Sequence, residues 1–322
     1  MKALVYDAPR SLHFVDRPPP GDSSSADAVV AVAAAGICGS DMHAFFGHDE
    51  RRPPPLILGH EAAGESGGEK VIVNPLAVCG KCDFCRRGRS NLCVRREILS
   101  MPPREGAFAE YLAAPRENIL PLPPPLSLRQ GALAEPLACG HHAAATALRH
   151  LHLSAEECAA AVLGGGAIGA AAALSLAARG VPKIHIAETN PLRRNVLQKI
   201  GDFIVSAPED LPQADIVIDA VGGADSRKRA TATAAAGGVI AHIGLAESEG
   251  GADMRRATLR EIVLCGVYTY TAAEFAETVR WMAEGRLGAL DWFETRPLKD
   301  GARAFADLSA GKIAAPKILL IP

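Results

Sequence analysis

The second half of the chain alternates short apolar runs with segments of helical periodicity. The runs of strand length are "AAAVLG", "KIHIAE", "DIVIDAVG" and "GVIAHIGL", and helical spacing holds in "AIGAAAALSLAARG" and "NPLRRNVLQKIG". In the second of these helices Asn190 is the expected N-cap, Pro191 the first helical residue and Gly201 the stop. Strands that alternate with helices predict right-handed crossovers and a parallel, doubly wound sheet, so the expected fold class is α/β.

The first 138 residues or so have a different pattern. Short β-like runs ("KALVY", "AVVAVAAAG", "KVIVNP") are separated by segments rich in proline and glycine, which predicts an irregular, mainly β domain with long loops. Towards the other end, "LREIVLCGVYTYT" is expected as a late strand of the parallel sheet or as its exit. Two amphipathic segments follow as helices, and "KILLIP" is expected as a closing strand.

Composition narrows the possible partners and location. The chain has 322 residues, of which 48% are hydrophobic and 22% charged, with a net charge of −2. This length is enough for two domains, and the charge gives no reason to expect nucleic acid or an anionic membrane surface as a partner. Because no apolar run reaches the length of a membrane span and the first residues do not resemble a secretion signal, we expect a cytoplasmic protein.

Four of the eight cysteines fall within fifteen residues, in "CGKCDFCRRGRSNLC". The spacing of Cys79, Cys82, Cys85 and Cys93 lets one loop place four thiolates around a tetrahedral Zn²⁺. Four protein ligands leave no position for water or substrate, so this zinc is expected to be structural. An iron–sulfur cluster uses similar ligands and is the alternative.

A glycine-rich turn, "VLGGGAIG", places Gly164, Gly166 and Gly169 in a G-x-G-x-x-G frame between an expected strand and an expected helix. In this context the first glycines allow a tight turn and the close approach of a pyrophosphate to the helix N-terminus, and the third lets helix and strand pack closely. The sequence therefore predicts a dinucleotide site. Further cofactor contacts are expected from Ala167, Ile168, Arg193 and Ile243.

Glu188 decides which dinucleotide we expect. It ends the next strand, 19 residues after Gly169, where a carboxylate accepts the adenosine ribose hydroxyls and repels a 2′-phosphate. NAD is therefore favoured over NADP. Arg193 and Arg194 lie close enough in sequence to keep NADP open.

Further side chains able to bind metal or carry protons are spread over three segments. They are Cys38, Ser40 and His43 in "GICGSDMH", His60 and Glu61 in "GHE", and Glu135 in "LAEPLACG". A cysteine, a histidine and a carboxylate form a plausible catalytic zinc site, because three protein ligands leave a position for a substrate oxygen. Spacing alone does not establish this site, since 22 and 75 residues separate its successive members.

Taken together, these segments resemble the zinc-dependent medium-chain alcohol dehydrogenases, and within them the sorbitol (polyol) dehydrogenase branch. The resemblance rests on "GICGSDMH", "LILGHEAAGE", the four-cysteine loop, "GAFAEYLAAP", "EPLACG", "VLGGGAIG" and "LREIVLCGVYTY". It implies a GroES-like catalytic domain made of both chain ends (1–138 and 271–322, with the zinc loop 79–93) and an NAD-binding Rossmann domain between them (139–270). It also implies an active site in the cleft between the domains, and a homodimer or homotetramer.

The resemblance implies roles for the scattered side chains. Cys38 and His60 match the family's ligands of the catalytic zinc, and Glu61 and Glu135 match glutamates that bind the metal in some members and lie beside it in others. Cys139 is about where primary-alcohol members place a cysteine ligand, although the wording "EPLACG" favours Glu135. Zinc would act as a Lewis acid on the substrate hydroxyl while hydride passes to the nicotinamide.

Proton transfer and substrate contacts follow from the same resemblance. Ser40 and His43 would relay the alcohol proton to solvent, and Asp41 would orient the zinc ligands. Arg260 matches an arginine near the substrate end of the site, as a contact for substrate hydroxyls or Glu135. Other residues have no motif support: Phe45, Phe46, Phe108 and Tyr270 fit either pocket or core, and His141, His142, His150 and His152 are expected as partly exposed helix residues.

The expected function is hydride transfer between a secondary alcohol or polyol and NAD. The alternatives are a related amino-alcohol, primary-alcohol or sugar-phosphate dehydrogenase and, in a different class, a non-catalytic dinucleotide-binding protein. The last alternative predicts a lost ligand or relay residue, yet the candidate ligands and relay residues named above are all present. The chain is shorter than the family pattern between "GHEAAGE" and "KVIVNP", and longer between "EPLACG" and the glycine turn.

Overall fold

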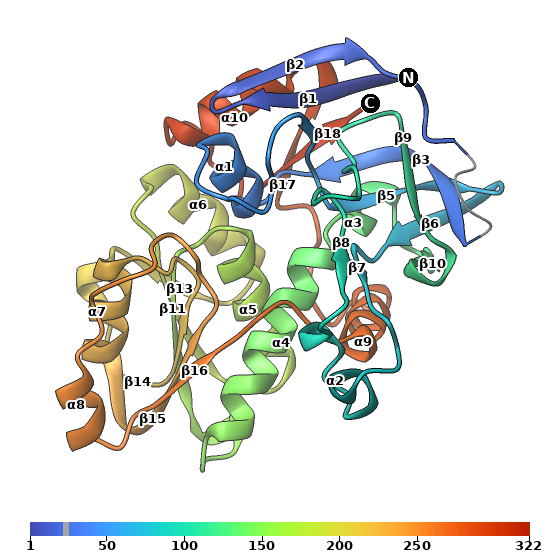
Figure 1. Cartoon of the computed structure of the whole chain (residues 1–322). Coiled ribbons are helices and arrows are strands. Elements are labelled where there is room, and N and C mark those ends of the chain that lie inside the picture. Colours follow the sequence, from blue (N-terminus) through green and yellow to red (C-terminus); the bar gives the residue numbers. More distant parts are fainter. Residues whose placement is uncertain (22–25) are drawn as a thin grey trace.

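The computed structural model describes residues 1–21 and 26–322. These residues form two parts, each built on its own main sheet (Figure 1). None of the helices in the described ranges is both long and apolar enough to cross a lipid bilayer. The predicted α/β fold class is confirmed.

A six-stranded parallel sheet forms one part, in the order β13-β12-β11-β14-β15-β16. Its strands are β11 (Ala159–Leu163), β12 (Lys183–Ala187), β13 (Ile204–Ser206), β14 (Ala214–Asp219), β15 (Ala234–His242) and β16 (Val263–Gly266). The helices around it are α4 (Ala134–His150), α5 (Ala167–Ala178), α6 (Pro191–Ile200), α7 (Ala224–Thr233), α8 (Met254–Leu259) and α9 (Ala272–Ala283). The predicted alternation of strands and helices is confirmed.

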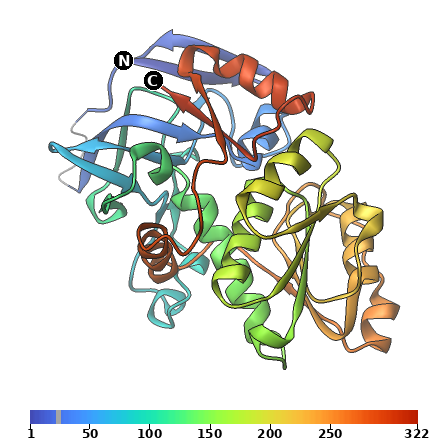
Figure 2. The same cartoon turned by 180° about the vertical axis from the view of Figure 1, so that it is seen from behind.

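Alternate residues of the central strands enter two different cores. Val162 and Ile216 pack on the side of α4, α5 and α9, whereas Leu163 and Val217 pack on the side of α7 and α8. Figure 2 shows the green helices α4 and α5 and the orange helices α7 and α8 on opposite sides of the sheet. Both faces of these strands are therefore buried, which explains why they are continuous apolar runs in the sequence.

The helix α6 begins and ends at the predicted residues, Asn190 and Gly201, and glycines flank α5. The Asn190 side chain accepts a hydrogen bond from the backbone N–H of Leu192 at 2.9 Å, and Pro191 is the first residue of α6. The helix α5 begins after Gly166, and Gly180, with φ +93°, follows its end. A glycine in the left-handed region is a common helix terminator because it has no Cβ to clash.

The other part is mainly β. In its seven-stranded sheet β10-β6-β5-β3-β18-β17 pair in that order and β9 also pairs with β3, and a second sheet has the order β2-β1-β4. The strands are β1 (Lys2–Ala8), β2 (Ser11–Asp16), β3 (Asp27–Gly36), β4 (Leu56–Ile57), β5 (Glu61–Ser66), β6 (Glu69–Val73), β9 (Tyr111–Pro115), β10 (Ile119–Pro121), β17 (Phe293–Pro297) and β18 (Lys317–Ile321). The helices are α1 (Gly39–Phe45), α3 (Leu128–Gly131) and α10 (Gly301–Ser309).

The last strand joins the two ends of the chain. β18 pairs antiparallel with β3, with Leu319 opposite Gly36 and Leu320 opposite Ala35, and the two termini lie close together in Figure 1. The helix α4 begins before residue 139, and α9, which begins after residue 270, packs into the core of the parallel sheet. The division into domains at these residues stays a proposal.

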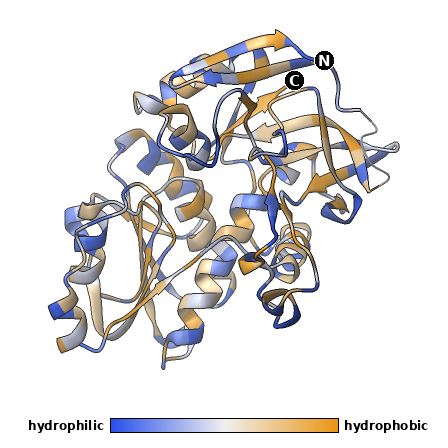
Figure 3. Cartoon of the chain, in the orientation of Figure 1, coloured by the Kyte–Doolittle hydropathy of each residue, from blue (hydrophilic) through white to orange (hydrophobic). Residues whose placement is uncertain are grey.

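The four-cysteine loop has little core of its own. It contains β7 (Leu76–Ala77), α2 (Asp83–Arg86) and β8 (Glu97–Ile98), and between residues 78 and 96 only Asn91 and Cys93 are buried. Figure 3 shows α2 as hydrophilic, in contrast to the strands of the parallel sheet. A loop of this kind needs a cross-link or a metal to hold its shape.

His141 departs from the sequence prediction. Its side chain is fully buried rather than partly exposed: it packs edge-on against Trp281, with ring centroids 4.6 Å apart. Its Nε2 lies 2.9 Å from Nη2 of Arg179 and 3.2 Å from a carboxylate oxygen of Glu277. The helix α9 folds back over α4, a contact between distant segments that the helical pattern of α4 does not reveal.

Candidate active site

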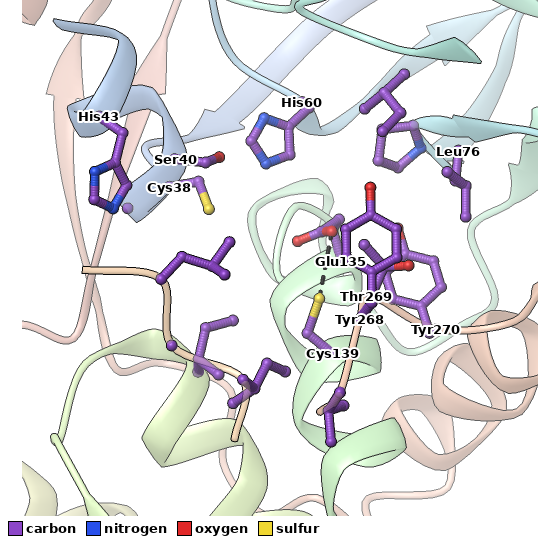
Figure 4. Close-up of a pocket in the computed structure, with 18 of the residues that line it drawn as sticks. Cys38, Ser40, His43, His60, Leu76, Glu135, Cys139, Tyr268, Thr269 and Tyr270 are labelled. Atoms are coloured by element: carbon purple, nitrogen blue, oxygen red, sulfur yellow. Dashed lines mark hydrogen bonds between the residues drawn. The ribbon is translucent and has the colours of Figure 1, made fainter. Parts of the chain in front are cut away.

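A pocket lies where the mainly β part meets the carboxyl ends of the parallel strands. It is lined by nine of the residues singled out in the sequence. Figure 4 labels seven of them, Cys38, Ser40, His43, His60, Glu135, Cys139 and Tyr270, and the other two are Ile168 and Ile243. They come from the start of α1, the segment before β5, the first turns of α4, the start of α5, the end of β15 and the segment before α9. The fold therefore brings together segments that are far apart in the sequence.

Cys38, His60 and Glu61 form the tightest group of candidate metal ligands. Each offers one ligand atom, and these atoms all lie within 4.8 Å of one another. Oε2 of Glu61 is buried and has no hydrogen-bond partner among the residues that the structure describes. A buried carboxylate oxygen without a partner is costly unless it binds an ion. The sulfur, nitrogen and oxygen donors fit Zn²⁺ and leave a fourth position open.

Gly36 makes room for the Glu61 carboxylate. The two residues face each other in the β3–β5 pairing. A Cβ at position 36 would lie 1.9 Å from Oε2 of Glu61. Any residue other than glycine would therefore clash with this carboxylate oxygen.

The ring of His60 is held from behind by a buried carboxylate. Its Nδ1 lies 3.6 Å from Oδ1 of Asp41 and 3.4 Å from Oγ of Ser100. Asp41 is fully buried and also accepts hydrogen bonds from the backbone N–H groups of Cys38, at 2.9 Å, and Gly59, at 3.2 Å. With Nδ1 engaged in this way, Nε2 is the nitrogen left for a metal, an arrangement typical of zinc-binding histidines.

Glu135 and Cys139 form a separate pair in the same pocket. Glu135 lies in the first turn of α4, and the thiol of Cys139, one turn later, donates a hydrogen bond to its Oε1 at 3.5 Å. Burial raises the pKa of Glu135, and burial raises the pKa of Cys139 well above its usual value. Glu135 is outside the group of three ligand atoms, so the geometry favours Glu61 as the third zinc ligand.

Ser40 and His43 both lie on α1 and line the pocket, next to Cys38 (Figure 4). His43 is partly buried, and burial lowers its pKa. A lowered pKa keeps the imidazole neutral near pH 7, which is the form that accepts a proton.

The expectation that Arg260 contacts substrate is wrong. Arg260 follows α8 and lies at the amino end of β16, where its carbonyl accepts a hydrogen bond from Gly237 N–H at 2.8 Å. The pocket is at the other end of that strand, and residues 267–270 line it. The motif "LREIVLCGVYTY" does reach the site, but through its last residues rather than its first.

Of the four aromatic residues, Tyr270 lies at the pocket, Phe45 and Phe108 lie in the core of the mainly β part, and Phe46 packs against that core. Tyr270 lines the pocket, and its hydroxyl donates to Oδ1 of Asn74 at 3.5 Å. Phe45 and Phe108 pack against Phe305 instead, with centroid separations of 5.3 and 6.0 Å, and belong to the core of the mainly β part.

Thr269 is a pocket residue that the sequence did not reveal. Its φ is +47°, which is unfavourable for a β-branched residue. Its hydroxyl is buried and has no partner within the part of the chain that the structure describes. Strain and an unpaired polar group in a pocket together indicate a functional position.

Lys317 is the second residue that the sequence did not reveal. It is 4% exposed, and its Nζ donates to Oε1 of Glu61 at 2.6 Å and to the carbonyl of Ile37 at 2.9 Å. Burial lowers the pKa of Lys317, but Glu61 and Cys38 outweigh this effect and the net pKa is raised. Lys317 therefore holds one oxygen of Glu61 and leaves the other available for a metal. No local pattern points to this pair, because 256 residues separate its members.

Replacing Lys317 with methionine is expected to lower the free energy of unfolding by about 3–5 kcal/mol, because the buried Glu61 charge loses its partner. Urea unfolding monitored by circular dichroism measures this change. The exposed Lys199→Met variant is the control, with an expected change within about 0.5 kcal/mol. The double variant Lys317→Met/Glu61→Gln should recover part of the loss, and strictly additive effects of the two single changes would contradict the coupling.

The four cysteines of the loop form a second metal site. Their sulfur atoms all lie within 4.8 Å of one another, with separations of 3.5 Å for Cys82–Cys85 and for Cys79–Cys93. Zinc–sulfur bonds of about 2.3 Å in a tetrahedron require sulfur atoms roughly 3.8 Å apart. The sulfur of Cys93 also accepts backbone hydrogen bonds from Cys79 and Arg95, each at 3.4 Å. This geometry fits four thiolates around one Zn²⁺.

A second pocket lies over the glycine-rich turn and fits a dinucleotide. It is lined by Gly164, Gly166, Glu188, Thr189 and Arg193, together with residues of α7. A Cβ on Gly166 would meet nothing within 4 Å, whereas one on Gly169 would lie 1.8 Å from the carbonyl oxygen of Gly164. Gly166 thus faces open space, and Gly169 lets α5 pack against the turn.

Glu188 is at the end of β12, as predicted, and is 5% exposed. Its two carboxylate oxygens accept backbone hydrogen bonds from Gly165 at 2.9 Å and Asn190 at 2.7 Å. Arg193 lies 3.3 Å from the same carboxylate. The acidic group is therefore fixed beside the turn, in position to meet a ribose.

Comparisons with known families agree with this division of sites. Residues 24–124 match the family model of the alcohol dehydrogenase GroES-like domain, and residues 167–284 match that of the zinc-binding dehydrogenases. The first stretch includes both groups of candidate metal ligands, and the second includes Gly169 and Glu188.

Individual proteins resemble the chain over most of its length. L-galactonate-5-dehydrogenase of Escherichia coli (strain K12) is 30% identical over 90% of this chain and 89% of its own length. Sorbitol dehydrogenase of Bacillus subtilis (strain 168) is 29% identical over 88% and 86%. The crystal structure of a zinc-binding dehydrogenase from Sinorhizobium meliloti 1021, bound to NADP, covers 100% of this chain and 99% of its own, with 26% identity and a TM-score of 0.85.

Proposed function

The chain belongs to the zinc-dependent medium-chain alcohol dehydrogenase family, and from that premise we propose that it oxidises a secondary CH–OH group of a polyhydroxylated substrate with a nicotinamide dinucleotide. One observation supports this proposal most directly. The candidate zinc ligands Cys38, His60 and Glu61 lie next to one another at a pocket that is also lined by Ile168 and Ile243, two expected cofactor contacts. The two relatives are named for L-galactonate and sorbitol, which share a chain of hydroxyl-bearing carbons.

We assign the residues of this site separate roles in zinc binding, proton transfer and the exclusion of water. Zinc held by Cys38, His60 and Glu61 would supply Lewis acidity, which lowers the pKa of a substrate hydroxyl. Ser40 accepts the hydroxyl proton and passes it to neutral His43, one turn further along α1. Asp41 keeps the His60 ring in place. The walls of the pocket exclude water from the carbon that gives up its hydride.

The test is NADH or NADPH formation with a panel of polyols, secondary and primary alcohols and amino alcohols. Each assay is repeated after chelator treatment, with zinc counted. We expect polyol oxidation that falls as one of two zincs per chain is removed, since two groups of ligands are present. No turnover of any alcohol by the fully metallated protein would overturn the proposal and favour a non-catalytic dinucleotide-binding protein. The same panel separates the amino-alcohol, primary-alcohol and sugar-phosphate alternatives.

Glu188→Ala is expected to raise the ratio of kcat/KM for NADP⁺ over NAD⁺ about tenfold to hundredfold, because the carboxylate binds ribose hydroxyls and repels a 2′-phosphate. Glu188 also holds the backbone of Gly165 and Asn190, so the ratio is the readout, since general damage cancels in it. The exposed Glu209→Ala variant is the control. An unchanged ratio would show that another residue sets the preference for NAD.

A homo-oligomer and a cytoplasmic location complete the proposal. β16 lies at the edge of the parallel sheet, and Leu259, Val263 and Leu264 beside that edge are 72%, 38% and 38% exposed. An exposed apolar edge strand favours pairing with another chain, and light scattering of the purified protein tests this. All eight cysteines lie in the described residues and none of them forms a disulfide, which suits a reducing compartment.

A further inference from the structure

Two adjacent arginines, Arg51 and Arg52, line the active-site pocket. They belong to the segment between α1 and β4, on the side of the pocket that also contains His43 and His60. Within the described chain, no other lysine or arginine lines this pocket, and Glu135 is its one acidic residue. Neither arginine was singled out from the sequence.

Arg52 is buried close to the candidate zinc ligand. It is 2% exposed, its Nε donates to the carbonyl of Ser100 at 3.1 Å, and the same Nε lies 3.4 Å from Oγ of Ser100. That oxygen is in turn 3.4 Å from Nδ1 of His60. The guanidinium of Arg52 is therefore two hydrogen-bond steps from the ring of His60, so the arginine pair lies on the same side of the pocket as this candidate zinc ligand.

Arg51 is partly open to the pocket. Its Nε and Nη2 donate to the two carboxylate oxygens of Asp49 at 2.8 and 3.0 Å, and its side chain is 55% exposed. Its Nη1 has no partner within residues 1–21 and 26–322. Asp49 thus fixes the plane of the guanidinium and leaves one edge available for a ligand.

The charges in this group do not cancel. Asp49 is almost buried and also accepts a hydrogen bond from Nη1 of Arg52 at 2.5 Å. Two guanidinium groups share the carboxylate of Asp49, so these three side chains together carry a net charge of +1. Burial raises the pKa of the nearby Asp41 carboxyl, but adjacent positive charges, Arg52 among them, outweigh burial and the net pKa is lowered. Arg52 is buried and is paired with Asp49 and Ser100, whereas Arg51 is 55% exposed. The positive charge that is open to an anion in the pocket is therefore that of Arg51.

The cofactor does not account for this charge. The glycine turn and Glu188 line the other pocket, whose basic residues are Arg193, Lys228 and Arg229. Arg51 and Arg52 are absent from that lining. The part of the cofactor over the glycine turn and Glu188 therefore lies in a different pocket from the arginines, and we take the substrate as the source of an anion that meets them.

We propose that the substrate is a polyhydroxylated acid whose carboxylate is bound by Arg51. Asp49 orients the Arg51 guanidinium, and Arg52 supports it. A hydroxyl-bearing carbon of the same molecule then lies beside Cys38 and His60. The single open guanidinium of Arg51 matches one carboxylate better than a phosphate ester, which carries nearly two negative charges at pH 7. The fixed guanidinium edge suits a planar carboxylate. The buried, unpaired hydroxyl of Thr269 in the same pocket offers a partner for a further substrate hydroxyl. This inference rests on the proposed function and specifies its substrate class.

The test compares kcat/KM of the zinc-loaded enzyme for sugar acids of four to six carbons, for the neutral alditols of matching stereochemistry, and for alditol phosphates. We expect the acids to exceed the matched alditols about tenfold to hundredfold, the range of one charge-assisted hydrogen-bonded contact. Arg51→Gln should reduce that preference to within about threefold, mainly through KM, because the contact exists before and during hydride transfer. Raising the salt concentration should raise KM for the acids more than for the alditols.

Arg129→Gln is the matched control, since Arg129 is exposed on α3 and lines neither pocket. Equal kcat/KM for acids and alditols, or a preference for acids that survives in Arg51→Gln, overturns the inference while leaving the proposed function intact. A preference for alditol phosphates over the acids overturns the choice of carboxylate. Absence of turnover with every compound in the panel counts against the proposed function itself.

Discussion

Replacing His60 with alanine is expected to lower kcat/KM by about 10³-fold or more, because a zinc ion supplies several kcal/mol of transition-state stabilisation. The zinc content of the purified variant should fall from two per chain to one, since the four-cysteine loop keeps its ion. The expected loss is larger than for any other single change considered above, because His60 both binds the metal and connects it to Asp41.

Steady-state kinetics and elemental analysis of the same sample measure both effects. His13→Ala, an exposed histidine on β2, is the control and should retain both metal and activity. A circular dichroism melt confirms that the variant is folded. A variant with two zincs and undiminished turnover would mean that the group around Cys38 is not the catalytic metal site.

The second large effect concerns the loop of four cysteines. Cys93→Ser is expected to release the structural zinc and to make residues 79–93 sensitive to trypsin. Structural zinc sites contribute about 10–16 kcal/mol in small zinc domains, and between residues 78 and 96 only Asn91 and Cys93 are buried. Without the ion, this loop has no core to keep it folded.

Limited proteolysis followed by mass spectrometry detects the cuts. Four cleavable residues lie inside the loop, namely Lys81, Arg86, Arg87 and Arg89, and Arg95 and Arg96 follow just beyond it. Cys265→Ser removes a cysteine outside the group and should leave the digestion pattern unchanged. A Cys93→Ser protein that keeps two zincs and resists trypsin would show that the loop is stable without four thiolates.

Local patterns in the sequence predict much of this structure. Three features could be predicted: the caps of α6, the glycine turn before α5 and the metal-binding spacing of the cysteines. Each depends on residues fewer than about twenty positions apart, so the nearby sequence is enough to specify it. The strands of the parallel sheet could be predicted because both of their faces are buried and so both are apolar.

Contacts between distant segments explain what could not be predicted. The burial of His141 depends on α9 folding over α4, and the wrong expectation for Arg260 arose because a motif does not tell which end of its strand meets the pocket. Lys317 and Arg52 carry charges that composition alone assigns to the surface. Their burial follows from partners that the chain brings together only when it folds: Glu61 for Lys317, and Ser100 for Arg52.

The pairing of β18 with β3 has a consequence for the newly made chain. The hydrogen bonds of Lys317 to Ile37 and Glu61 span 280 and 256 residues, so a ribosome has translated nearly the whole sequence before they form. The candidate ligands Cys38, His60 and Glu61 are translated before the cysteine loop, but the Lys317 contact that fixes Glu61 comes last. The loop draws its four ligands from residues 79–93 alone. Because protein segments fold as they emerge, we expect this loop to reach its final geometry before the Glu61 carboxylate does.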